Sequence, residues 1–116
     1  MGIWFFLKIL QPQSEIIMKS DEIFQTIGRY HLELSRLGVS RLGLFGSAVR
    51  NETRPESDLD FLVEFRSGEK NYDHFFDLAE MLEHLFGRKV DLLTVESVSP
   101  VLRQRIFEEA RFETIH

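Results

Sequence analysis

The sequence predicts an α/β (α+β) protein in which helices pack against a small mixed β-sheet of about three strands. The chain has 116 residues, a length that suits one domain with one hydrophobic core. Its 43% hydrophobic and 28% charged residues are typical of a globular protein. Helical and strand patterns also alternate along the chain, in the order α-β-α-β-α-β-α, which favours a sheet covered by helices.

The first helix is predicted from Asp21 to Leu37, where apolar residues recur at spacings of three and four. We expect Ser20 to be its N-cap and Gly38 to end it. The short apolar run Val39–Phe45 that follows is typical of a strand. This region therefore predicts one helix and then one strand.

The next segment is predicted to turn before a second strand begins. Gly46 and Ser47 end the first strand, and residues from Ser47 to about Asn51 fit a short helix. A polar loop containing proline continues to Ser57. Asp58–Phe65 then alternates between acidic and apolar residues over most of its length, which predicts a strand with its aspartates on one face.

The last part of the chain is predicted to form two helices and a strand. Apolar spacing predicts a helix over Tyr72–Phe86 that ends at Gly87. A third strand is expected over Lys89–Val95. Ser99 before a proline is a typical helix start, so the final helix is expected over about Pro100–Phe112.

Composition excludes several classes of function and location. The net charge is −5 and no block of Lys or Arg exists, so no direct nucleic-acid binding is expected. The chain has no cysteine, which excludes disulfides and thiolate metal sites. The opening MGIWFFLKIL is too short to span a bilayer and lacks the features of a signal peptide. We therefore expect a cytoplasmic protein that does not enter a membrane.

The beginning of the chain has two open interpretations. Met18 directly precedes the first predicted helix and resembles a natural start, so residues 1–17 are interpreted as an N-terminal extension. This extension is expected either to be disordered or to add a strand. An ordinary ordered N-terminal segment is the alternative. In either case we place the domain at residues 18–116.

Three aspartates predict a metal site. Asp58 and Asp60 lie one residue apart and point to the same side of their strand. Asp91 lies within an apolar strand, where a carboxylate is costly to bury unless it faces a polar cleft or a metal. Carboxylate oxygens suit Mg²⁺, with Mn²⁺ as an alternative, and three such groups can hold two ions.

The turn upstream predicts a phosphate site. Backbone N–H groups at Gly46 and the hydroxyl group of Ser47 suit the terminal phosphates of a nucleotide. Arg50, about one turn beyond, is either an additional phosphate contact or a solvated surface residue.

These residues together resemble the nucleotidyltransferase signature of the polymerase-β superfamily. That signature has an apolar residue before Gly-Ser, then Asp-apolar-Asp about ten residues later and a further Asp on a strand. Here they are Phe45, Gly46, Ser47, Asp58, Leu59, Asp60 and Asp91. Residues from about 21 to 112 are similar to the minimal nucleotidyltransferase (MNT) family.

The resemblance implies a nucleotidyltransferase fold and specific roles for these residues. Asp58 and Asp60 are expected to bind both metal ions, and Asp91 the catalytic ion. Asp91 is also expected to help deprotonate the acceptor hydroxyl group. The implied reaction transfers AMP from ATP to a hydroxyl group and releases pyrophosphate. Gly46 and Ser47 are expected to hold the nucleotide phosphates.

The MNT resemblance also implies a partner. Members of this family resemble antitoxins that are paired with a helical HEPN-family ribonuclease toxin and adenylylate it on a tyrosine. Two alternatives stay open: an antitoxin that acts by binding alone, and an enzyme that modifies a small molecule such as an aminoglycoside. Since the chain has little room for an acceptor domain, we expect the acceptor surface to come from a partner or a homo-oligomer.

Overall fold

The structure is a computed structural model that describes residues 19–52 and 57–115. The predictions for residues 1–17, and part of the predicted polar loop, lie outside these described residues. Within the described residues, no helix is long and apolar enough to cross a lipid bilayer.

The sheet is mixed, as predicted, but it has four strands. They are β1 (Val39–Phe45), β2 (Leu59–Phe65), β3 (Val90–Thr94) and β4 (Arg111–Thr114), in the spatial order β3-β2-β1-β4. β1 is antiparallel to both of its neighbours, whereas β2 and β3 are parallel. The parallel pair places the beginnings of β2 and β3 at the same end of the sheet.

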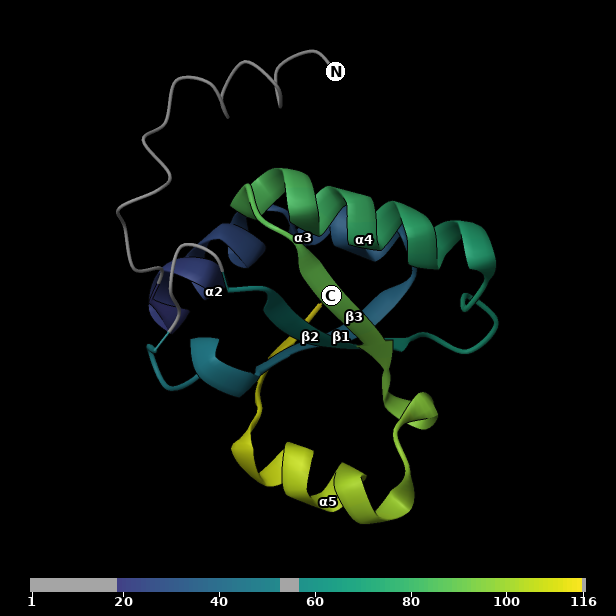
Figure 1. The fold of residues 1–116 in the computed structure, drawn as a ribbon. Helices are drawn as coiled ribbons and strands as arrows, with labels where there is room; N and C mark the ends of the chain where they lie inside the picture. The colour runs from purple at the N-terminus through teal and green to yellow at the C-terminus, as the bar shows by residue number, and fades with distance from the viewer. Residues whose placement is uncertain (1–18, 53–56, 116) are drawn as a thin grey trace.

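Helices lie on both sides of this sheet (Figure 1). α2 (Ser20–Arg29), α3 (His31–Arg36) and α4 (Tyr72–Phe86) cover one face, and α5 (Pro100–Glu109) lies on the other side. The main hydrophobic core is on the three-helix side. Its largest fully buried side chains are Ile23, Ile27, Leu34, Leu42, Leu44, Leu59, Phe61, Leu78 and Leu82.

The alternation of β2 determines which face carries its acidic residues. Leu59, Phe61 and Val63 belong to the core beneath α2–α4. Because side chains alternate along a strand, Asp60 points to the opposite face, the side on which α5 lies. Leu62, also on this second face, is only 1% exposed. The α5 side of the sheet is therefore partly apolar and partly acidic.

The first predicted helix is divided into two. The prediction of one helix over Asp21–Leu37 is wrong, because the backbone leaves helical geometry at Tyr30, with φ −113° and ψ 23°. Gly28 lies within the turn before the break, and glycine costs about 1 kcal/mol in a helix interior. The prediction of Ser20 as the N-cap is also wrong by one residue, because Lys19 is the N-cap and Ser20 is the first residue of α2.

The end of the last helix is the second correction. The predicted helix over Pro100–Phe112 stops at Glu109, and β4 follows almost at once. Phe112 pairs with Gly43 of β1, and its ring lies against the glycine backbone, where a Cβ atom would come within 2.5 Å of the ring. This long-range contact outweighs the local helical preference of the segment, as tertiary pairing often does.

The remaining boundaries agree closely with the predictions. β1 and α4 have the predicted limits, and Gly87 ends α4 in the left-handed conformation with φ 65°. Ser99 is confirmed as the N-cap of α5, since its hydroxyl oxygen accepts a hydrogen bond from the N–H of Leu102. β2 and β3 each begin one residue later than predicted, so Asp58 immediately precedes β2.

Candidate functional site

The three predicted aspartates lie at the end of the sheet where β2 and β3 begin. Asp60 of β2 and Asp91 of β3 are register partners in the parallel ladder. Neighbouring strands are about 4.8 Å apart, and register partners point to the same face. Asp58 is two residues before Asp60, just outside the strand. The topology thus places Asp58, Asp60 and Asp91 at the same end of the sheet, although Asp58 and Asp91 are 33 residues apart in sequence (91 − 58).

Electrostatics at this end of the sheet disfavour the charged form of Asp60. Burial raises the pKa of the Asp60 carboxyl group, and the negative charges of Asp91 and Asp58 raise it further. Asp91 itself is exposed, and Asp58 is half-buried. The site therefore contains one partly desolvated carboxylate between two others, an arrangement in which a bound cation would relieve the repulsion.

These aspartates fit a hard divalent cation by chemistry and position. They offer only oxygen donors, which Mg²⁺ and Mn²⁺ prefer, and they approach one another from adjacent strands. Among the described residues, however, no three acidic or histidine side chains are gathered closely enough to hold a metal ion as they stand.

Gly46 lies directly against Asp60. β1 ends at Phe45, which pairs with Asp60, and the chain then turns at Gly46 with φ +76°. A Cβ atom at this position would lie 2.5 Å from Asp60 Oδ2. Both the backbone conformation and the contact with the carboxylate require glycine here. The Gly-Ser turn therefore begins directly beside the Asp60 carboxylate.

A short turn of helix extends from Gly46. The 3₁₀ helix η1 (Gly46–Ala48) starts the turn, in place of the predicted helix over Ser47–Asn51, and further hydrogen bonds continue it. The N–H of Val49 donates to the oxygen of Gly46 at 3.2 Å, and that of Arg50 donates to Ser47 at 3.1 Å. The Ser47 hydroxyl group has no hydrogen bond to another described residue.

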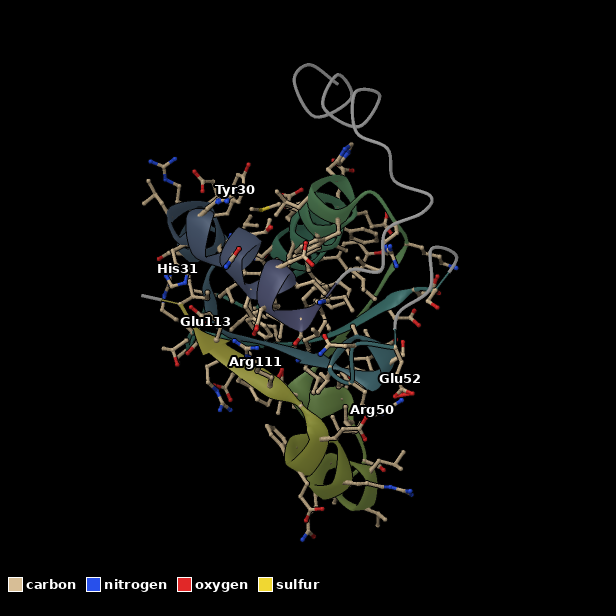
Figure 2. The ribbon with its side chains drawn as sticks, turned by 90° about the vertical axis from the view of Figure 1, so that its left-hand side faces the viewer. Tyr30, His31, Arg50, Glu52, Arg111 and Glu113 are labelled. Atoms are coloured by element: carbon tan, nitrogen blue, oxygen red, sulfur yellow. The ribbon has the colours of Figure 1, made fainter. Side chains whose placement is uncertain are left out.

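Arg50 is held by two glutamates. Its Nε donates to Glu52 Oε1 at 2.6 Å, and its Nη1 donates to Glu109 Oε1 of α5. The hydrogen bond to Glu52 and the charge of Glu109 raise the pKa of the guanidinium group. Figure 2 shows Arg50 and Glu52 together beside α5. In this arrangement the guanidinium group faces carboxylates, so a phosphate would have to compete with them.

Two residues at this site were not predicted from the sequence. Glu109 contacts Arg50 from 59 residues away, and no local pattern indicates such a pair. Asn51 adopts φ +58°, and its side-chain oxygen accepts a hydrogen bond from the N–H of Ser20. An asparagine at the end of a helical turn often adopts the left-handed conformation, so the positive φ of Asn51 could have been predicted from the sequence. Its hydrogen bond to Ser20 could not.

Comparison with known proteins connects this geometry to one family. Residues 28–112, which include the whole candidate site, match the family described as the nucleotidyltransferase domain. The chain is 44% identical over 77 residues to a Methanocaldococcus jannaschii protein named "Putative protein adenylyltransferase", a match that covers 66% of this chain and 82% of that protein.

A second relative and a solved structure are similar over most of their length. The chain is 36% identical over 90 residues to "Protein adenylyltransferase MntA" of Thermococcus cleftensis, which covers 77% of this chain and 90% of that protein. A solved structure described as a "putative minimal nucleotidyltransferase" is 35% identical, with a TM-score of 0.68. The match covers 78% of this chain and 92% of the chain in that solved structure.

Proposed function

Because the chain belongs to the nucleotidyltransferase family, as a minimal nucleotidyltransferase, we propose that it transfers AMP from ATP to a hydroxyl group of a partner protein. The observation that carries this proposal is the meeting of Asp60 and Asp91 on adjacent strands, with Gly46 against the Asp60 carboxylate. Acidic groups for a cation and a turn for phosphates lie side by side there.

The reaction requires one bond to form and one to break. The acceptor oxygen attacks the α-phosphorus of ATP, the bond from that phosphorus to the β-phosphate oxygen breaks, and pyrophosphate leaves. The proton of the attacking hydroxyl group passes to Asp91, which is exposed and so within reach of an incoming acceptor. Asp60 is less exposed than Asp91, and its carboxylate lies against Gly46.

Asp58, Asp60 and Asp91 would hold Mg²⁺, in a site for up to two ions. When bound, Mg²⁺ supplies positive charge that offsets the phosphates and favours loss of the hydroxyl proton. The protein's own contribution is to place Asp60 and Asp91 on neighbouring strands, with Asp58 just before the first of them. At the other end of the nucleotide, the Gly46–Ala48 turn supplies backbone N–H groups and the Ser47 hydroxyl group to the phosphates.

The acceptor is proposed to be a protein. Relatives with 36% and 44% identity are named protein adenylyltransferases, which supports a protein rather than an aminoglycoside as the acceptor. The resemblance to the MNT family narrows the proposal to a tyrosine of a HEPN-family toxin, with this chain as its antitoxin. In this role AMP transfer would silence the ribonuclease activity of the toxin.

The experiment that tests this function measures AMP transfer directly. The chain is incubated with its candidate HEPN partner, Mg²⁺ and ATP labelled at the α-phosphate. We expect label on the partner, and no label when Asp58→Asn replaces the wild type. Absence of label with the wild type would refute the proposed transfer. If Asp58→Asn still neutralises the partner fully, neutralisation occurs by binding alone.

Arg50 provides a separate prediction about ATP affinity. Glu109→Gln removes one of the two carboxylates that hold the guanidinium group and leaves it freer to meet a phosphate. We expect the KM for ATP to fall by up to about fivefold, in keeping with the small strength of an exposed ion pair. Steady-state transfer assays over a range of ATP concentrations measure this change.

The control for this prediction is the neighbouring residue on α5. Glu108 is also an exposed glutamate of α5, with no ion pair to another described residue, so Glu108→Gln changes the same charge without releasing Arg50. The KM for ATP should stay unchanged in this variant. An unchanged or higher KM in Glu109→Gln would mean that Arg50 does not bind a phosphate of ATP and serves only to connect the turn to α5.

A further inference from the structure

We propose that Asn51 is a positioning residue, which fastens the end of the phosphate-binding turn to the start of α2. The inference rests on the proposed function, because it assigns the turn at Gly46–Ala48 to the phosphates of ATP. It concerns a residue that makes no contact with the carboxylates and lies at the opposite end of the turn.

The backbone of Asn51 closes the turn. Its N–H donates to the oxygen of Ala48 at 3.2 Å, and the N–H of Glu52 donates to the oxygen of Ser47 at 2.9 Å. These two bonds, with Asn51 in the left-handed conformation at φ +58°, form a Schellman motif. Asparagine is one of the few residues other than glycine that adopt this conformation at low cost. The backbone of Asn51 thus fixes where the turn ends.

The side chain of Asn51 then joins the turn to a distant helix. Its Oδ1 atom accepts a hydrogen bond from the N–H of Ser20 at 2.8 Å, across 31 residues of sequence. Ser20 is the first residue of α2, where backbone N–H groups have no partner within the helix. Ser20 is buried, and Ile23 and Ile27 of α2 pack in the hydrophobic core. The turn is therefore fastened to a well-packed part of the protein.

The two ends of the turn are held by different means. At its beginning, Gly46 lies against Asp60 and follows the paired strand β1. At its end, Asn51 is bonded to α2. The Ser47 hydroxyl group and the nearby backbone N–H groups lie between these two attachments. If the attachment at Asn51 is lost, these groups should sample more positions, and binding of phosphates should weaken.

Three substitutions at Asn51 separate its backbone from its side chain. Asn51→Gly tolerates the positive φ but has no Oδ1 atom, so it removes only the bond to α2. Asn51→Ala removes this bond and also strains the backbone. Asn51→Asp keeps an oxygen acceptor and the tolerance for the left-handed conformation, so it should restore what Asn51→Gly loses.

Asn71 offers a matched control. Its Oδ1 atom caps the start of α4 by accepting a hydrogen bond from the N–H of His74, also at 2.8 Å. Asn71→Gly therefore removes a bond of the same kind and length, together with a longer 3.4 Å bond between Asn71 Nδ2 and His74 Nδ1, in a turn that contains none of the candidate site residues. Any effect of a lost helix cap on stability alone should appear in both glycine variants.

The first test measures nucleotide binding and transfer. In Asn51→Gly we expect Kd and KM for Mg²⁺-ATP to rise about five- to tenfold, the value of one capping hydrogen bond, with kcat nearly unchanged. Asn51→Asp and Asn71→Gly should keep wild-type KM values. Equal KM values in wild type and Asn51→Gly would overturn the proposal, as would an equal rise in Asn71→Gly.

The second test does not depend on activity. Amide hydrogen exchange of the whole chain without nucleotide should be faster over residues 46–52 in Asn51→Gly than in the wild type or Asn71→Gly. Unchanged exchange would overturn the proposed attachment. If the wild type transfers no AMP to any acceptor, the proposed function fails, while the exchange result still decides whether Asn51 holds the turn.

Discussion

Asp60→Asn is expected to abolish AMP transfer and, at the same time, to stabilise the metal-free protein at neutral pH. The loss of transfer should be at least about 100-fold, because the substitution removes the charge of the carboxylate that we propose as a metal ligand. The gain in stability follows from the environment of the same carboxylate, which is unfavourable to charge when no cation is bound.

The sign of the stability effect comes from the direction of the pKa change. Burial, with the charges of Asp91 and Asp58, raises the pKa of Asp60 above its ordinary value of 3.8. Between that value and the raised one, the folded protein binds more protons than the unfolded chain, so stability falls as pH rises. Because asparagine does not ionise, the Asp60→Asn variant does not lose stability in this way as the pH rises. Its advantage should be complete above this interval and absent below about pH 3.8.

Urea denaturation with a metal chelator, over a series of pH values, measures the effect. Asp77→Asn is a suitable control, since Asp77 is an exposed aspartate on α4 with no ion pair to another described residue. Addition of Mg²⁺ should stabilise the wild type and reduce the advantage of Asp60→Asn. A variant that is less stable than the wild type at neutral pH, or that still transfers AMP at the wild-type rate, would contradict the assignment of Asp60.

The sequence predicted those elements whose signals are local. α4 has its predicted limits because its apolar spacing, its N-cap Asn71 and its stop at Gly87 all act within the segment itself. β4 was missed because the strand exists through its pairing with β1 and through the contact of Phe112 with Gly43. The break at Tyr30 was missed since the apolar stripe of the helix continues across it, with Leu34 still fully buried.

The candidate site follows the same division. The spacing of Asp58 and Asp60, and the apolar surroundings of Asp91, carried enough information to propose a shared cluster, and the β2–β3 register brings Asp60 and Asp91 together. The connections that hold the turn after β1 could not be predicted in the same way. Arg50 with Glu109 and Asn51 with Ser20 are contacts between residues far apart in sequence, so only the folded chain reveals them.

Gly46→Ala is expected to have the other large effect, a loss of AMP transfer of about 100-fold together with a loss of stability. Two separate costs arise at this position. The left-handed conformation, at φ +76°, costs an alanine about 1–2 kcal/mol. The new Cβ atom would also lie 2.5 Å from Asp60 Oδ2, so the Asp60 carboxylate must move away. The second cost acts directly on the Asp60 carboxylate, and the first strains the turn that begins at Gly46.

Gly68→Ala separates these two costs. Gly68 has a similar φ of +80°, but a Cβ atom there would have no neighbour within 4 Å. In urea denaturation, Gly68→Ala should therefore lose only the stability that the backbone strain costs, and Gly46→Ala should lose at least as much, while only Gly46→Ala loses transfer and Mg²⁺ binding. If the two variants transferred AMP equally well, the contact between Gly46 and Asp60 would be unimportant for the reaction. Because Gly68→Ala carries similar backbone strain away from the candidate site, a difference between the two variants shows that the effect arises at Gly46, from the displaced Asp60 carboxylate together with the strained turn.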